Sequence, residues 1–152
     1  MTREEAKHIL DRALSFVSAD EATALLTESS EAATRFANSE ITQNVARSDM
    51  KCEIRVAFGD RVGSASINSF DDDSLQSAVE RAEAMARVAA PDTEFVPCPG
   101  PADAPDVNAF DPAVASVDPM QRADAVKTAV AEGDRTAVKL AGSFTARSTT
   151  EA

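Results

Sequence analysis

The chain has 152 residues, a formal net charge of −11, and hydrophobic residues at 43% of its positions. This length suits one domain with a core, or one domain and the start of another. Two cysteines, Cys52 and Cys98, are too few for a disulfide framework. No apolar run approaches the roughly 20 residues that span a bilayer, and the charged first residues do not resemble a signal peptide. We therefore expect a cytoplasmic protein without a membrane partner.

Charge is unevenly distributed along the chain. Residues 32–70 carry five basic and four acidic side chains, whereas residues 71–152 carry seven basic and fifteen acidic ones. A nucleic-acid-binding protein usually has a basic stripe that neutralises phosphates, so we expect no nucleic-acid partner. Residues 32–70 form the part that repels acidic partners least, which favours them as a contact surface. Acidic helices that simply keep the protein soluble would produce the same distribution.

The first predicted element is a helix from about residue 3 to residue 18. Thr2 and Glu5 have the spacing of a capping box, in which each side chain bonds the other's backbone amide. Apolar residues then recur at three- and four-residue intervals and form one stripe: Ala6, Ile9, Leu10, Ala13, Phe16 and Val17. Residues 21–30 are a weaker strand candidate.

The clearest predicted strand runs from Met50 to Phe58, where apolar and polar side chains alternate. Gly59-Asp60 permits a type II′ turn into an antiparallel strand over residues 61–68. That strand has small apolar residues, including Gly63, which would let a helix approach closely. Asn38-Ser39 is a second predicted turn and joins residues 33–37 to residues 40–47.

A second amphipathic helix is predicted to begin at Asp71 and to end at Pro91. All seven prolines lie between residues 91 and 119, which indicates an extended linker. Asp118-Pro119 then opens a third helix that ends at Gly133, and residues 138–150 have strand character.

These elements predict an α+β fold. A small, mostly antiparallel sheet is covered by amphipathic helices, and a Pro-rich linker leads into a second helix–strand unit. We place an N-terminal α+β module at residues 1–90, the linker at 91–118, and the start of a second, truncated α/β module at 119–152.

Residues that could carry chemistry are few. His8 is the single histidine and fits a helix face better than a metal site. The run Asp71-Asp72-Asp73 fits helix capping better than cation binding, and Cys52 alternates inward as a core thiol. We predict no catalytic residue and no metal ligand in this chain.

A peptide-binding surface is the one candidate site. Arg35, Asn38, Gln43 and Asn44 lie on or between predicted strands of nearly neutral charge. An extended peptide could pair with such a strand through main-chain hydrogen bonds, with these side chains adding selectivity. The alternative interpretation is that these side chains simply face solvent and have no binding role.

The order and spacing of several segments resemble the TldD/PmbA family, whose members are also called modulators of DNA gyrase. The resemblance is carried by residues 34–39 (TRFANS), by Ile41, Gln43 and Asn44, by Arg55 to Ala65, by Ala78, Val79, Arg81 and Ala82, by Gln121 to Ala123, and by Ala141-Gly142. The segment TRFANS is similar to the PmbA-like branch, in which the zinc motif is absent, or to a third related branch.

The resemblance implies a bacterial zinc metallopeptidase subunit or a relative of one, which forms a homo- or heterodimer with a family member and acts on unfolded peptides. The HExxxH zinc motif belongs to the C-terminal part of the family's active subunits, so any zinc would lie outside this chain. The chain would then be an N-terminal, non-catalytic module that contributes to dimer assembly and to peptide access for proteolysis. A zinc-less scaffold subunit with no proteolytic role, or an unrelated binding domain, remains an alternative.

Overall fold

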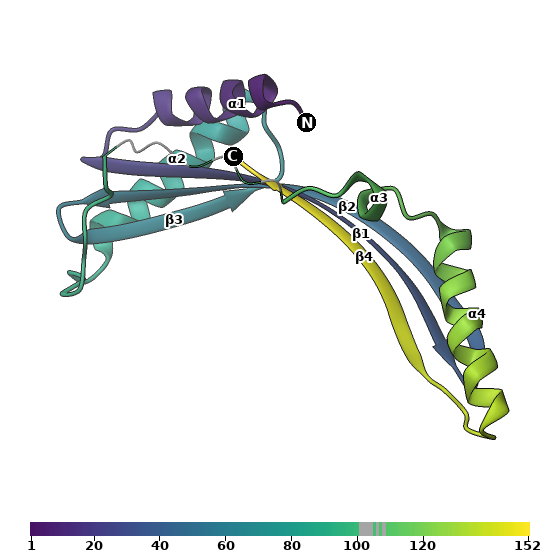
Figure 1. Cartoon of the computed structure of the whole chain (residues 1–152). Helices are drawn as coiled ribbons and strands as arrows, with labels where there is room; N and C mark the ends of the chain where they lie inside the picture. The colour runs from purple at the N-terminus through teal and green to yellow at the C-terminus, as the bar shows by residue number, and fades with distance from the viewer. Residues whose placement is uncertain (101–104, 106, 108) are drawn as a thin grey trace. The chain divides into compact units, whose positions relative to one another are not determined.

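The computed structural model describes residues 1–100, 105, 107 and 109–152. Its elements in chain order are α1 (Arg3–Ser15), β1 (Glu21–Ala37), β2 (Glu40–Phe58), β3 (Arg61–Ile67), α2 (Asp72–Val88), α3 (Pro112–Ala115), α4 (Pro119–Arg135) and β4 (Gly142–Glu151), as Figure 1 shows. The strands form one sheet in the order β3-β2-β1-β4. The predicted α+β fold is confirmed.

Two compact units make up the chain. The first unit comprises Met1–Glu28, Met50–Asp106 and Thr150–Ala152, and the second comprises Ser29–Asp49 and Val107–Thr149. β1 and β2 are each one continuous strand, where the sequence predicted pairs of shorter ones, and both strands contribute residues to both units.

The predicted linker over residues 91–118 lies partly outside the described residues. Its described part includes α3, a short helix that the sequence did not predict. Asp111 begins α3 by accepting a hydrogen bond from the backbone amide of Ala113 at 2.8 Å.

The helix α1 begins at the predicted capping box between Thr2 and Glu5. It ends at Ser15, three residues before the predicted end. Ser18 is not available for another helical turn, because its backbone amide donates to the Glu83 carboxylate of α2 at 2.6 Å.

The strands β2 and β3 form the predicted antiparallel hairpin, with Phe58 opposite Arg61 and Cys52 opposite Ile67. Gly59 adopts a φ of +59° at the turn, a conformation that glycine reaches without a steric cost. Gly63 lies under α2, where an added Cβ would come within 2.5 Å of the Ala86 backbone nitrogen and closer still to the Ala82 carbonyl oxygen. The predicted close approach of a helix to this strand is therefore confirmed.

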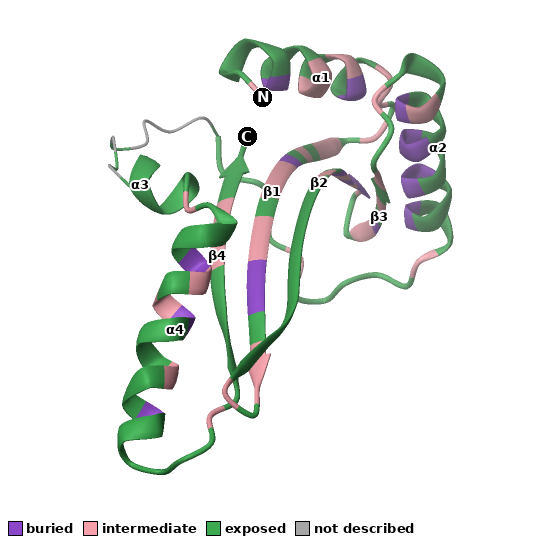
Figure 2. Ribbon diagram, turned by 90° about the vertical axis from the view of Figure 1, so that its right-hand side faces the viewer, coloured by how far each residue is buried: buried purple, intermediate pink, exposed green. Residues whose placement is uncertain are grey.

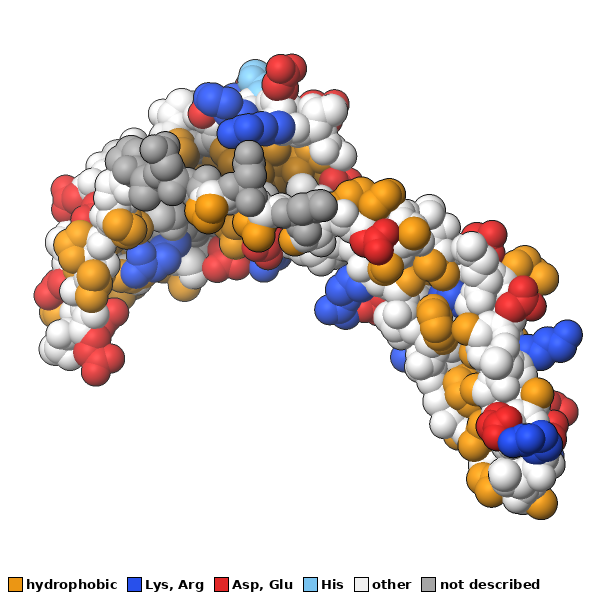
Figure 3. Space-filling view, viewed as in Figure 1, with side chains coloured by type: hydrophobic (Ala, Val, Ile, Leu, Met, Phe, Trp, Pro, Cys, Tyr) orange, Lys and Arg blue, Asp and Glu red, His pale blue; other side chains and the backbone are white. Residues whose placement is uncertain are grey.

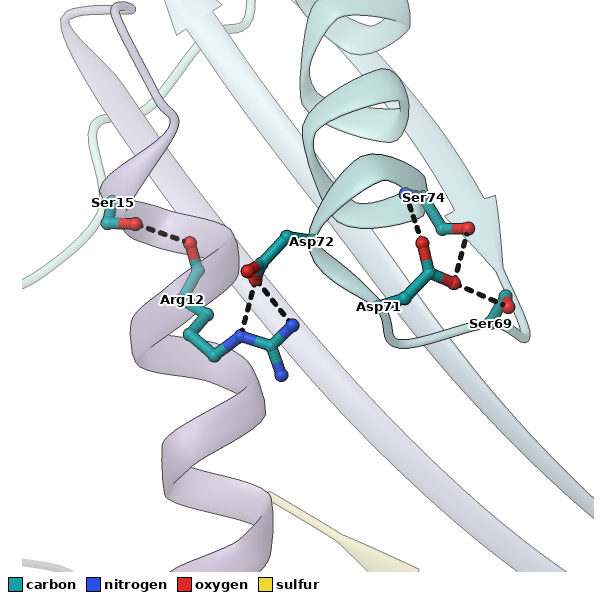
Figure 4. A network of polar contacts seen from close by, with 6 residues as sticks. All are labelled: Arg12, Ser15, Ser69, Asp71, Asp72 and Ser74. Carbon is teal, nitrogen blue, oxygen red and sulfur yellow. Dashed lines mark hydrogen bonds and ion pairs between the residues drawn. The ribbon is translucent and has the colours of Figure 1, made fainter.

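Polar contacts fix the beginning of α2 (Figure 4). Asp71 is its N-cap and accepts hydrogen bonds from Ser74 and Ser69. The backbone amide and the hydroxyl of Ser74 are the main cause that lowers the pKa of Asp71 to about 2. The neighbouring Asp72 forms an ion pair with Arg12 of α1, whose Nε lies 2.7 Å from the carboxylate oxygen.

The core of the first unit lies between the two helices and one face of its strands. Buried residues, coloured purple on the ribbon, recur along α2 in Figure 2. The cluster consists of Ala6 and Ala13 from α1, Leu26 from β1, Cys52, Ile54 and Val56 from β2, and Leu75, Ala78, Val79, Ala82 and Ala86 from α2. The predicted cover of the sheet by these two helices is present.

The second unit holds α4 and β4. Asp118 and Gln121 form a capping box at the start of α4, with Pro119 in the first turn, as the sequence predicts. The predicted end at Gly133 is wrong, because the helix continues to Arg135. Gly133 is instead buried against Leu140, whose side chain would lie 2.8 Å from an added Cβ.

The strand β4 begins at Gly142, four residues after the predicted start, and lies beside β1. Just beyond its end, Leu26 and Ala152 exchange two backbone hydrogen bonds of 2.9 and 3.0 Å, the pattern of an antiparallel pair. The predicted turn at Asn38-Ser39 is confirmed, with φ values of 52° and 65°.

Candidate functional site

The four predicted peptide-contact residues all lie on or between β1 and β2 in the second unit, but not on one face. Arg35 and Gln43 are neighbours, with 3.5 Å between the guanidinium Nη1 and the amide Oε1. Asn44 points to the opposite face, where it bonds Arg122 of α4. Asn38 lies in the turn. The structure therefore brings two of the four together.

Arg35 and Gln43 line a hollow of about 450 Å³ on the face of the sheet. Its remaining lining residues are Glu31, Ala33, Val45, Ala46 and Arg47. Most of these positions are two residues apart along a strand, so they share one face. Alanine and valine form much of the lining, which leaves the longer polar side chains around an open space.

Glu31 holds two further arginines at this face. Its Oε2 accepts a 2.9 Å hydrogen bond from Nε of Arg147 on β4 and a second, short one from Nη2 of the same guanidinium. Its Oε1 lies 3.6 Å from Nη2 of Arg47. The hydrogen bond from Arg147 is the largest influence that lowers the pKa of Glu31. The carboxylate therefore stays ionised at neutral pH.

Arg47 and Arg147 were not among the residues selected from the sequence. The alternation of side chains along one strand could have placed Arg47 on a face with Gln43 and Val45. Arg147 lies more than a hundred residues from Glu31, and no sequence signal fixes the register between β1 and β4.

The opposite face of these strands is structural. Arg122 of α4 is 2% exposed and donates to Thr34 Oγ1 at 3.2 Å, to Asn44 Oδ1 at 2.9 Å and to the Val117 carbonyl at 2.9 Å. These three acceptors are neutral, so hydrogen bonds rather than an ion pair compensate the buried guanidinium. Asn44 thereby joins the helix to the strands.

The outer edge of β2 is open over its first half. Pairing with β3 begins at Cys52, and residues 40–49 are exposed. Within the part of the chain that the structure describes, no other strand pairs with this edge. Such an edge presents unpaired backbone donors and acceptors that can bind an extended chain.

A second hollow lies beside α4 and is mainly apolar. It measures about 390 Å³ and is lined by Ser39, Ile41, Met120, Ala123, Asp124, Val126, Lys127 and Val130. In the space-filling view, hydrophobic side chains gather at the surface over α3 and α4 (Figure 3). Met120, Val114 and Phe110 are among the exposed ones.

The thiols and the histidine belong to the first unit. His8 is on α1 and lines a separate hollow of about 430 Å³ together with Glu5. Cys52 is buried in the core, and this burial raises the pKa of its thiol. Cys98 is exposed.

Zinc sites in proteins use clustered histidine, cysteine and carboxylate ligands. Among residues 1–100, 105, 107 and 109–152, no three such side chains are grouped so that they could hold a metal ion. The described residues therefore do not fit a zinc site.

No helix in the described residues is both long enough and apolar enough to cross a bilayer.

Comparison with known proteins finds one matching family model. Residues 22–86 match the family model of PmbA/TldA metallopeptidase domain 1. A comparison with curated protein sequences finds no significant match.

Three solved structures share the fold. TldE from Thermococcus kodakarensis is similar with a TM-score of 0.74 and 19% identity, over 97% of this chain and 34% of that one. A protein from Bacteroides thetaiotaomicron, described as a candidate modulator of DNA gyrase, has a TM-score of 0.69 and 18% identity over 99% of this chain and 41% of its own. A similarly described protein from Thermotoga maritima has a TM-score of 0.69 and 12% identity over 95% of this chain and 38% of its own.

This chain spans between 34% and 41% of the length of these three proteins. The family match covers nearly all of β1, the whole of β2 and β3, and most of α2. It includes the resembling segments between residues 34 and 82, whereas those at residues 121–123 and 141–142 lie outside it. The match of residues 22–86 to the first domain of that family, together with the shared fold, supports the predicted resemblance of this chain to the N-terminal portion of TldD/PmbA proteins.

Proposed function

We propose that this chain is the N-terminal, non-catalytic module of a TldD/PmbA-type metallopeptidase subunit, and that it contributes to dimer assembly and to peptide access. The observation that carries the proposal is the match of residues 22–86 to the first domain of the metallopeptidase family. The catalytic zinc of such a subunit would be held by the C-terminal part of the parent protein. The parent would be a bacterial protein of the cytoplasm.

The peptide part of the proposal is supported by the open edge of β2. An unfolded peptide that adds to residues 40–49 as a further strand would satisfy the unpaired backbone groups of that edge. Its side chains would then lie next to Gln43 and Arg35. The turn residue Asn38 would contact the peptide where the edge begins.

The assembly part of the proposal rests on the family resemblance. The partner would be a second copy or a related family member, and no step of proteolysis is assigned to residues of this chain. The catalytic residues would come from the C-terminal part of the parent protein.

The test is the zinc content and peptidase activity of the parent protein, purified alone and together with any co-purifying family member. We expect tightly held zinc in one subunit and cleavage of an unstructured peptide by the assembled pair. Zinc-free preparations that cleave no peptide, alone or together, would contradict the peptidase proposal. They would favour a scaffold subunit with no proteolytic role.

A further inference from the structure

We propose that the second unit binds the carboxylate groups of extended acidic peptides at an arginine face, formed by Arg35, Arg47 and Arg147 with Gln43 around Glu31. This inference rests on the proposed peptide contact and specifies the class of peptide that the contact selects. None of the three arginines takes part in the buried network of Arg122.

The first argument is charge. Three guanidinium groups surround a single carboxylate at this face, which leaves a local excess of positive charge in a chain of net charge −11. Arg147 donates to Glu31 through one edge only, with Nε and Nη2. Since a guanidinium carries five N–H donors in a planar fork, most of the donors here remain available for an anion.

The second argument is the arrangement of the arginines. Arg35 donates only weakly, to the neutral Gln43 at 3.5 Å, and Arg47 is 3.6 Å from Glu31. Both side chains border the 450 Å³ hollow, whose lining includes the small residues Ala33 and Ala46. A carboxylate that enters the hollow could replace these long contacts with shorter, charge-assisted hydrogen bonds.

The third argument is the strand edge. In a peptide added to β2, successive side chains point to opposite faces of the sheet, so every second one lies over the arginine face. Main-chain bonds to residues 40–49 would hold the peptide in register, and its alternate acidic side chains would face Arg35 and Arg47. Acidic residues at alternate positions are therefore the preferred pattern.

A general basic surface does not account for the cluster. The chain as a whole has 26 acidic and 15 basic residues, and α4 of the same unit carries both signs. Arg35 of β1 and Arg47 of β2 line the hollow from two different strands, and Arg147 of a third strand, β4, donates to Glu31 in its lining.

The experiment measures binding of two short fluorescent peptides to the purified chain by anisotropy at low and high salt. One peptide has Glu at alternate positions and the other has Gln at the same positions, and both are acetylated and amidated. The site variant is R35Q together with R47Q. The control variant is R135Q together with K139Q, which removes the same charge from the same unit outside the hollow.

We expect the Glu peptide to bind roughly tenfold more tightly than the Gln peptide, with a difference that shrinks at high salt. R35Q/R47Q should abolish that preference while the Gln peptide binds as before. R135Q/K139Q should preserve it. Circular dichroism of each variant shows that the fold is retained.

Three results would overturn the inference, and they have different meanings for the function. Equal binding of both peptides would remove the carboxylate preference but leave the peptide contact standing. If neither peptide binds, the proposed peptide contact is contradicted as well. An equal loss in the control variant would show that overall charge, rather than the arginine face, attracts the peptide.

Discussion

Gly63 illustrates how one residue decides the packing of the first unit. The strand β3 and the helix α2 approach so closely at this position that only a hydrogen atom fits between them. The nearest groups are backbone atoms of Ala82 and Ala86, which cannot move without displacing the helix. The side chain is therefore excluded by geometry, while the backbone of Gly63 itself has an ordinary strand conformation.

We predict that G63A destabilises the chain by about 1–3 kcal/mol, because the added methyl group overpacks the contact between β3 and α2. Urea denaturation followed by circular dichroism measures the change in the free energy of unfolding. G100A is the matched control, since an added Cβ at Gly100 meets no atom within 4 Å. Equal stability of the two variants would show that α2 is free to move away from the strand.

Single residues were also the scale at which the sequence was most informative. The capping residues Thr2, Asp71 and Asp118 were predicted, because a cap depends on side chains within three positions along the chain. The end of α4 was not predicted, because Gly133 was interpreted as a helix terminator. Its small size instead accommodates Leu140.

At the scale of elements, the strands differ most from the prediction. The sequence predicts four short strands, with gaps at residues 31–32 and 48–49. In the structure, β1 continues through the first gap and β2 continues through the second. Alternation reports burial of one face, and residues 40–49 of β2 are exposed. A strand held by backbone pairing alone leaves little hydrophobic signal.

The helix α4 is attached to its strands by a polar contact as well as by an apolar one. Val126 supplies buried apolar surface, and Arg122 supplies three hydrogen bonds. Arg122 is a donor to the buried hydroxyl oxygen of Thr34, so this contact is sensitive to substitution. Without Arg122, Asn44 Oδ1 would keep the hydrogen bond that Thr34 Oγ1 donates to it at 3.2 Å. Asn44 is predicted from the sequence as a peptide contact, but in the structure it accepts a hydrogen bond from Arg122.

We predict that R122A lowers the free energy of unfolding by about 2–4 kcal/mol, because the buried oxygen of Thr34 loses its donor and a cavity is created. K127A, an exposed change on the same helix, should alter it by less than about 0.5 kcal/mol. Thermal and urea unfolding of both variants provide the measurement. If R122A is no less stable than K127A, the hydrogen bonds of Arg122 do not hold α4 to the strands.

At the scale of the whole molecule, the fold class and the family could be predicted from the sequence, and the peptide-contact candidates only in part. Arg35 and Gln43 lie within one hairpin, so local pattern was sufficient to select them. Arg147 reaches Glu31 through the pairing of β4 with β1, which depends on long-range register. The arginine face could therefore be recognised only in the structure.

The central proposal for this chain is that an extended peptide binds along the β1–β2 hairpin of the second unit. The most direct measurement is photo-crosslinking of an unstructured acidic peptide to the parent protein, with the crosslinked residues identified by mass spectrometry. We predict crosslinks within residues 31–49, which are reduced by R35Q/R47Q and unchanged by R135Q/K139Q. Crosslinks confined to other parts of the parent protein would contradict the claim.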